Sequence, residues 1–101
     1  MLIIREVFQC KPGKAKDLVA IFKAAIPLMV DGKDVKSMRV MSDFVAAYWT
    51  VIVETEAESM DAVRAAMKTS RANPALGNIM KDYMDCVSGG HREVFNVEAE
   101  G

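Results

Sequence analysis

The segment FVAAYWTVIV, residues 44–53, contains no charged side chain. Its only polar side-chain atoms are the hydroxyls of Tyr48 and Thr50 and the indole N–H of Trp49. A strand with one face in water alternates apolar and polar residues, and this segment does not. It therefore predicts a strand that is shielded from water on both faces, and other parts of the protein must supply that cover.

Two segments that precede it also predict strands. Residues 2–10, LIIREVFQC, are rich in Ile, Val and Phe, and residues 35–42, VKSMRVMS, lead directly into the opening segment. If residues 42–43 form a two-residue turn, Met41 pairs with Phe44 across a hairpin. Side chains alternate along paired strands, so this register defines two faces. One face would carry Ser37, Arg39, Tyr48 and Thr50, and the other Met38, Val40, Trp49 and Val51.

Helical spacing and a capping pattern predict two helices. Apolar residues recur every three or four positions over residues 15–29. Pro27 should kink or end this helix, because proline cannot donate a hydrogen bond to the preceding turn. Thr55 and Glu58 form a T-x-x-E capping box, which predicts a second helix over residues 56–71.

A third helix and a last strand follow. Asn73 is the predicted N-cap, with Pro74 at the first helical position, as helix starts prefer. Apolar residues keep helical spacing over residues 74–87, and the SGG at residues 88–90 should end the helix. Residues 91–98, HREVFNVE, predict the last strand.

The predicted order of elements is β-α-β-β-α-α-β, in which the last two helices form one crossover. Right-handed crossovers place the helices on one face of a four-stranded antiparallel sheet. We therefore expect an α+β fold of the βαββαβ type, as a single domain over residues 1–101. Residues 2–10 and 44–54 should form the two central strands.

The sheet face without helices needs a partner. Four strands spaced by ~4.8 Å, with six residues at ~3.3 Å each, give this face an area of roughly 400 Å². Both sides of the strand predicted at residues 44–54 are apolar, so this face should be largely apolar. Monomers seldom expose apolar patches beyond a few hundred Å². We therefore expect a homodimer in which two sheets pack face to face around a barrel-like core. The alternative is a monomer in which loops cover Trp49 and its neighbours.

Composition excludes several classes of partner. The chain is 51% hydrophobic and 27% charged, with a net charge of −1 and no run of lysines or arginines, so we expect no nucleic-acid partner. The short apolar start is followed at once by Arg5 and Glu6, and no apolar segment approaches the ~20 residues that span a bilayer. We expect no membrane partner and a cytoplasmic location.

The chain has two cysteines and one histidine. Cys10 and Cys86 are predicted to be free thiols that fill core space, with a redox pair as the alternative. These three side chains do not have the spacing of a zinc site. No metal and no cofactor is expected.

Three long stretches of the sequence resemble the dimeric α/β-barrel superfamily, most closely its NIPSNAP-type and antibiotic-biosynthesis-monooxygenase-type domains. The resemblance implies a ferredoxin-like fold, dimerisation through the sheets into an α/β barrel, and a ligand pocket between the sheet and helices of one subunit. The superfamily includes cofactor-independent oxygenases, haem-degrading enzymes, small isomerases and proteins with no known activity. The stretches are REVFQCKPGKAKDLVAIFKAA (5–25), YWTVIVETEAESMDAV (48–63) and NPALGNIMKDYMDCVSGGHREVFNVE (73–98).

Two departures from the haem-degrading branch argue against that activity. The branch carries an asparagine on its first strand, and the matching position in this chain is Glu6. It also uses a histidine of a late helix as an iron ligand, and the predicted helices at residues 56–71 and 74–87 contain none.

Glu6 is the first candidate pocket residue. It shares a side of its strand with Ile4 and Phe8, and a carboxylate among apolar residues must be paired, hydrogen-bonded or protonated. It could act as a general acid or base. The alternative, which we favour, is an ion pair with Arg92 or Arg39 on a neighbouring strand, or plain exposure near an edge of the sheet.

The other candidate pocket residues are Arg39, Tyr48, Trp49 and His91. Adjacent Tyr48 and Trp49 should point to opposite faces, one toward the helices and the other toward the dimer core, and either could stack on a planar ligand or fill the core. His91 is a candidate because histidine is the side chain that ordinarily changes charge near neutral pH, and it should be half exposed. Arg5 points away from Glu6 and should meet a carboxylate such as Glu93.

Four methionines of the predicted helices are expected to face the sheet. They are Met60, Met67, Met80 and Met84.

These observations leave three functions open. The first is an enzyme that oxidises or isomerises an apolar or aromatic compound without a cofactor, in the manner of a monooxygenase-like protein. The second is a protein that binds such a compound without a reaction. The third is a structural or interaction module with no ligand pocket. A cavity of ~300 Å³ or more that reaches Glu6 would favour the first two.

Overall fold

The structure is a computed structural model that describes all 101 residues, and it contains one sheet of four antiparallel strands. The strands are β1 (Leu2–Cys10), β2 (Ser37–Ser42), β3 (Thr50–Ala57) and β4 (Val87–Asn96). Their order across the sheet is β2-β3-β1-β4, so β1 and β3 are the central strands, as predicted.

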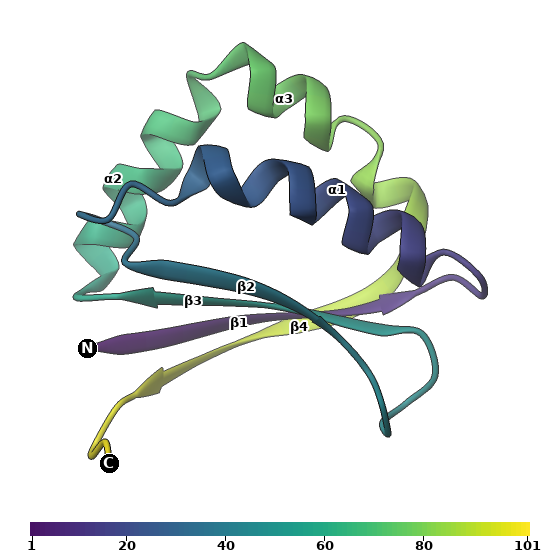
Figure 1. Ribbon diagram of the computed structural model, residues 1–101, viewed down its shortest axis with the longest axis horizontal. Helices are drawn as coiled ribbons and strands as arrows, with labels where there is room; N and C mark the ends of the chain where they lie inside the picture. Colours follow the sequence, from purple (N-terminus) through teal and green to yellow (C-terminus); the bar gives the residue numbers. More distant parts are fainter.

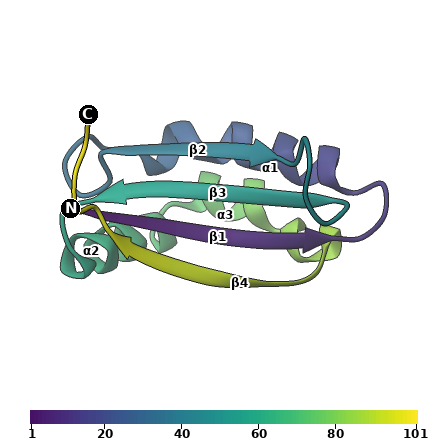
Figure 2. The same cartoon turned by 90° about the horizontal axis from the view of Figure 1, so that it is seen from below.

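The helices all lie on one face of the sheet (Figure 1), and the other face carries none (Figure 2). They are α1 (Ala15–Met29), α2 (Met60–Arg71), α3 (Pro74–Met80) and a short 3-10 turn, η1 (Tyr83–Cys86). α1 packs on β2 and β3, α2 contacts β3, α1 and α3, and α3 packs on α1. The predicted α+β fold is confirmed.

Two predicted helix boundaries are confirmed. α1 ends at Met29, two residues after Pro27. α3 begins with Pro74, and the side-chain oxygen of Asn73 accepts the N–H of Ala75 at 3.0 Å. That bond satisfies one of the N–H groups that have no partner within the helix.

Side chains of β1 alternate between the helix layer and the opposite side of the sheet. Phe8 lies opposite Val51 of β3 and stacks on Phe22 of α1, with ring centroids 5.6 Å apart. This contact joins the first helix to the centre of the sheet. The buried cluster around it consists of Cys10, Leu18, Phe22, Val51, Val53 and Cys86.

The first half of the FVAAYWTVIV segment is a loop, and β3 begins at Thr50. Asp43 closes the hairpin: its N–H donates to the carbonyl oxygen of Thr50 and its side chain accepts the N–H of Thr50, each at 3.1 Å. The six residues between them are therefore looped out. Phe44 is fully exposed, Tyr48 is 84% exposed, and Trp49 has a φ of +63°. The prediction of a strand buried on both faces is wrong for this half.

The register of the hairpin shifts accordingly. Ser42 pairs with Val51, instead of Met41 with Phe44. Because the shift is an even number of residues, each residue within β2 and β3 keeps its predicted face. Only the loop residues Tyr48 and Trp49 leave the sheet, so the expectation that each lies on one of its faces is wrong.

α2 begins at Met60, four residues after the predicted start. Thr55 does not cap it, because Thr55 lies within β3 opposite Ile4. Ser59 is the N-cap, and its hydroxyl oxygen accepts the N–H of Ala62 at 3.1 Å. Pairing with β1 thus extends the strand through the expected capping box.

The end of the predicted third helix is also different. α3 stops at Met80, and the chain rejoins the sheet at Val87. Gly89 and Gly90 lie inside β4 and do not end a helix. A Cβ atom on Gly90 would lie 2.2 Å from the carbonyl oxygen of Val7, so glycine is required for β4 to approach β1.

The sheet face without helices, called the open face below, carries a row of alternating charges. Arg39, Glu54, Arg5 and Glu93 lie directly opposite one another across the four strands. The expectation of a largely apolar face is wrong along this row, because the apolar residues that suggested it lie in the hairpin loop. On either side of the row the open face carries Ile3, Val7, Met41, Ile52 and Phe95.

Candidate functional site

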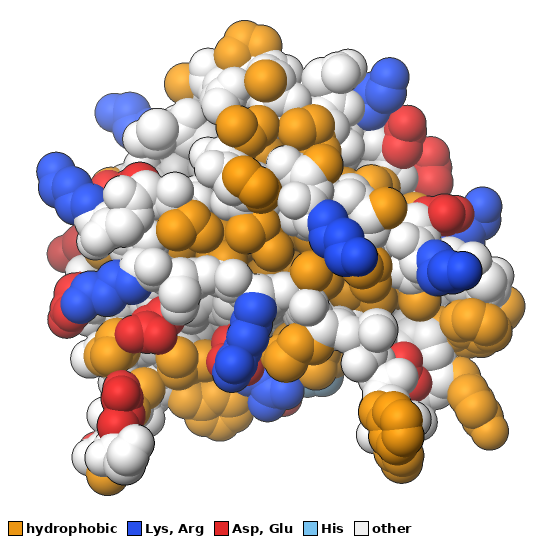
Figure 3. Space-filling model, viewed as in Figure 1, with side chains coloured by type: hydrophobic (Ala, Val, Ile, Leu, Met, Phe, Trp, Pro, Cys, Tyr) orange, Lys and Arg blue, Asp and Glu red, His pale blue; other side chains and the backbone are white.

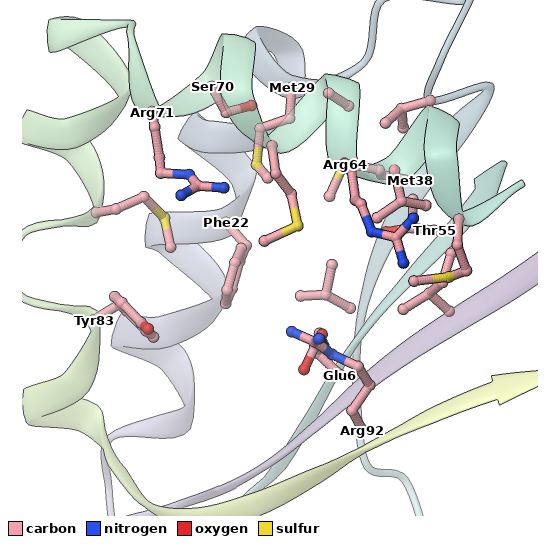
Figure 4. A pocket seen from close by; sticks show the side chains of 18 of the residues that line it. Glu6, Phe22, Met29, Met38, Thr55, Arg64, Ser70, Arg71, Tyr83 and Arg92 are labelled. Atoms are coloured by element: carbon pink, nitrogen blue, oxygen red, sulfur yellow. Dashed lines mark hydrogen bonds and ion pairs between the residues drawn. The ribbon is translucent and has the colours of Figure 1, made fainter.

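A cavity of about 670 Å³ lies between the helices and the sheet. It exists because α2 and α3 rise away from the sheet while α1 packs on it (Figure 1). Figure 4 shows side chains from both layers pointing into this space. Thirteen of its 19 lining residues are hydrophobic. They include five methionines, Met29, Met38, Met60, Met67 and Met80, and three aromatic residues, Phe8, Phe22 and Tyr83.

Three aromatic rings form one end of the cavity. Phe8 stacks on Phe22 at 5.6 Å, and Tyr83 meets Phe8 edge-on with ring centroids 6.4 Å apart. Aromatic pairs at these distances and angles stabilise each other, so this end of the cavity is held in one arrangement. The methionines, by contrast, are flexible and can adapt to the shape of a bound molecule.

Glu6 is the only carboxylate among the lining residues. It lies on β1 opposite Arg92 of β4, and the Arg92 Nε donates to its Oε1. The predicted ion pair of Glu6 is therefore present, with Arg92 and not with Arg39 as its partner. The Glu6 side chain is 31% exposed and that of Arg92 is 56% exposed, so solvent screens the pair in part.

Two further arginines reach the cavity from α2. Arg64 and Arg71 are seven positions apart, which places them on the same side of the helix. Arg64 forms an ion pair with Asp61 at 2.8 Å, whereas Arg71 forms none. In Figure 4 the Arg64 side chain extends from α2 toward Glu6 and Arg92, whereas that of Arg71 lies above Phe22.

The other four candidate residues lie outside this cavity. Arg39 is on the open face, where it pairs with Glu54. Tyr48 and Trp49 lie in the hairpin loop. His91 is exposed at the side of β4 that faces away from the helices. Arg39 and His91 lie outside the cavity because side chains alternate along a strand, and both residues occupy positions on the face of the sheet opposite to Glu6.

Ion pairs hold the charged row of the open face together. Arg5 contacts both Glu54 and Glu93, each at 3.6 Å, which confirms the predicted pairing of Arg5 with Glu93. His91 Nε2 lies 2.9 Å from Glu93 Oε2. Arg39 completes the row through its contact with Glu54. A second, smaller cavity of about 360 Å³ lies beside it, lined by Arg5, Val7, Gln9, Ala46, Ala47, Thr50, Ile52, Gly90, His91 and Glu93.

Cys10 and Cys86 are free and buried in the core, as predicted. Burial raises the pKa of both thiols above the ordinary range of cysteine. Both are therefore protonated at neutral pH and poor nucleophiles. Neither lines the large cavity.

No three His, Cys, Asp or Glu side chains are grouped so that they could hold a metal ion. None of the helices combines the length and the apolar character needed to cross a membrane.

Sequence reasoning missed several cavity residues. Of the four methionines expected to face the sheet, Met60, Met67 and Met80 line the cavity, whereas Met84 is exposed. Arg64 and Arg71 were not predicted. In the sequence these two arginines are marked only by their seven-residue spacing along the edge of the apolar stripe of α2. That spacing alone does not distinguish a cavity wall from a helix face in water.

No profile of a known protein family matches the chain, and no curated protein sequence matches it. Solved structures do match. An uncharacterised NIPSNAP domain protein from Burkholderia xenovorans has a TM-score of 0.82 at 10% sequence identity, over 98% of this chain and 96% of that chain. A candidate antibiotic biosynthesis monooxygenase from Chloroflexus aurantiacus has a TM-score of 0.74 at 14% identity, over 99% and 96%.

A second candidate antibiotic biosynthesis monooxygenase, from Nitrosomonas europaea, has a TM-score of 0.78 at 5% identity, over 98% of this chain and 100% of that chain. At such identities the likeness concerns the fold alone. It confirms the resemblance found in the sequence at that level: the chain has the ferredoxin-like α+β fold that the NIPSNAP-type and antibiotic-biosynthesis-monooxygenase-type structures share.

Proposed function

We propose that the protein binds a small apolar or aromatic compound in the cavity between its helices and its sheet. The cavity of about 670 Å³ carries this proposal. Packed protein interiors hold few voids larger than a water molecule, whereas ligand sites usually measure ~300–1,000 Å³ and are mostly apolar. The size and lining of this cavity therefore match a ligand site better than a packing defect.

A monooxygenase-like reaction without a cofactor is the second candidate function. One observation favours it: a single carboxylate, Glu6, lies in the wall of a mostly apolar cavity. Two of the structures with this fold are candidate antibiotic biosynthesis monooxygenases. Substrate activation would fall to Glu6, which would accept a proton from the substrate while Arg92 holds its Oε1.

We also propose that two copies of the chain associate through the open face. The hairpin of residues 43–49 extends beyond the sheet on the side away from the helices (Figure 1), and hydrophobic side chains gather at its end (Figure 3). Phe44, Val45 and Tyr48 are exposed there. The charged row is internally neutralised by its ion pairs, so a second sheet could cover it at a reduced desolvation penalty.

A thermal-shift screen against small aromatic compounds tests the proposed binding. A ligand at 100 times its Kd raises the free energy of unfolding by about 2.7 kcal/mol, which shifts the Tm of a chain of this length by about 10 °C or more. We expect at least one hit whose shift is lost in the variant Ser70→Phe, which fills the cavity from α2.

Thr69→Phe is the matched control, because Thr69 is the preceding residue of the same helix and does not line the cavity. It should keep the ligand-induced shift. Hits that survive Ser70→Phe would bind elsewhere and contradict the proposal. A complete absence of hits would instead support a structural module whose cavity has no ligand.

A further inference from the structure

We infer that the compound bound in the cavity is an apolar acid whose anionic group contacts Arg71. This inference rests on the proposed function and names the class of ligand for the same cavity. It follows from the charges of the cavity wall, from the free guanidinium of Arg71 and from the position of Arg71 relative to the apolar residues.

The charged side chains that reach the cavity are unbalanced. They are Arg64, Arg71, Arg92 and Glu6, or three positive charges and one negative charge. Glu6 neutralises Arg92 through their ion pair. The remaining two arginines have no counter-charge within the cavity, so a neutral ligand would leave that excess in place and an anionic ligand would reduce it.

Arg71 is the better placed of the two. Arg64 already has a carboxylate partner outside the cavity, Asp61. Arg71 has no ion pair, and its neighbour Ser70, which also lines the cavity, adds a hydroxyl donor. The planar guanidinium of arginine presents two parallel donors that match a carboxylate, so Arg71 can bind one without breaking another contact.

The position of Arg71 separates the charged and apolar parts of the ligand. It lies in the last turn of α2, at the solvent-exposed rim of the cavity. Met67 lies one turn earlier on the same side of the helix, and Figure 4 shows Arg71 above Phe22 and Tyr83. A ligand whose anionic group lies at the rim would therefore place its apolar part over the methionines and the aromatic end of the cavity.

Matched probes test the charge requirement. 2-Naphthoic acid is ionised at pH 7, whereas 2-naphthamide has the same ring and a neutral amide. Binding can be followed by NMR of 13C-methyl methionine, because five of the eight methionines line the cavity. The other three, Met1, Met41 and Met84, do not line it and serve as internal controls.

We expect both probes to shift the methyl signals of the cavity methionines, with the acid binding roughly fivefold more tightly than the amide at low salt. An ion pair at an exposed rim supports a preference of about that size, and salt should weaken it. Arg71→Gln should remove the preference, and Arg71→Lys should retain part of it.

Lys68→Gln is the matched control, since Lys68 is the other basic residue in the last turn of α2 and does not line the cavity. It should leave the preference unchanged. If Arg71→Gln does not fold, the salt dependence of the preference in the unaltered protein provides the test.

The possible failures are distinguishable. Equal binding of acid and amide would overturn the anionic class and leave the proposed binding intact. A preference that Lys68→Gln reduces as much as Arg71→Gln would overturn the assignment to Arg71. If neither probe shifts any cavity methionine, both the inference and the proposed function are contradicted.

Discussion

Glu6 and Arg92 face each other across β1 and β4 and form an ion pair on the helix side of the sheet, at the wall of the large cavity. The pair fixes one carboxylate and one guanidinium at the floor of the cavity, opposite the arginines of α2. It also joins a central strand to the edge strand β4, whose helix side is only partly covered.

A double-mutant cycle measures this interaction. Because both side chains are partly exposed, we expect Glu6→Gln and Arg92→Gln to couple by about 0.5–1 kcal/mol in the free energy of unfolding. Urea denaturation of the two single variants and the double variant gives the value. A coupling indistinguishable from zero would show that the pair does not contribute to the stability of the sheet.

Gly90 and Gly89 are predicted to differ sharply in their tolerance of a side chain. A Cβ atom at Gly90 would meet the backbone of Val7 at 2.2 Å, whereas one at Gly89 would have nothing within 4 Å. We expect Gly90→Ala to destabilise the protein by about 2–4 kcal/mol and Gly89→Ala by less than about 1 kcal/mol. Thermal or urea denaturation of both variants checks this, and equal losses would contradict the close approach of β4 to β1.

The fold could be predicted because its signals are local and repeated. Asn73 and Pro74 define a helix start through contacts within one turn, and apolar spacing identifies α1. The errors arise where a distant partner decides the local structure. Thr55 has the sequence of a helix cap but pairs with Ile4 of β1, some fifty positions away in the chain.

The loop at residues 44–49 and the cavity could not be predicted for related reasons. The loop is apolar, and specific hydrogen bonds hold it outside the sheet, among them the two between Asp43 and Thr50 and the one from the Cys10 N–H to the Trp49 carbonyl oxygen. The cavity depends on how far α2 stands from the sheet, which residue patterns do not encode. Glu6 was identified because a carboxylate on an apolar strand face is unusual, whereas Arg71 resembles any surface arginine near a helix end.

Asp31 should make the stability of the folded protein depend on pH in the acid range. Its Oδ1 accepts the N–H groups of Val35, Lys33 and Asp34 at 2.8–2.9 Å, and these bonds lower its pKa, the one from Val35 most. Because the pKa of Asp31 is lower in the folded protein than in the unfolded chain, its charge stabilises the folded protein at a pH above the unfolded-state pKa of about 3.9. This stabilisation is lost as the pH falls through the folded-state pKa.

Asp31→Asn should therefore reduce the Tm at pH 7, and its difference from the unaltered protein should shrink as pH falls below about 4. Asp34→Asn is the control from the same loop, because the Asp34 side chain accepts none of these bonds. A difference between Asp31→Asn and the unaltered protein that stays constant down to pH 2 would contradict the role of the Asp31 charge.

The exposed hairpin provides a test of the proposed dimer. Phe44 and Tyr48 are more exposed than any other aromatic residue of the chain, and they lie on a loop that extends past the open face. Truncating an aromatic side chain that anchors an interface commonly weakens it by more than about 1–2 kcal/mol, or roughly tenfold in Kd. We expect the double variant Phe44→Ser, Tyr48→Ser to dissociate at least tenfold more readily, with an unchanged circular dichroism spectrum.

Met84→Ser is the matched control, because Met84 is 61% exposed but lies on η1, in the helix layer. It should leave the Kd of the dimer unchanged. Sedimentation equilibrium over micromolar concentrations measures all three proteins. A monomeric unaltered protein would contradict association through the open face. A dimer that tolerates the double variant would instead place the contacts on the sheet itself, on the apolar residues that flank the charged row.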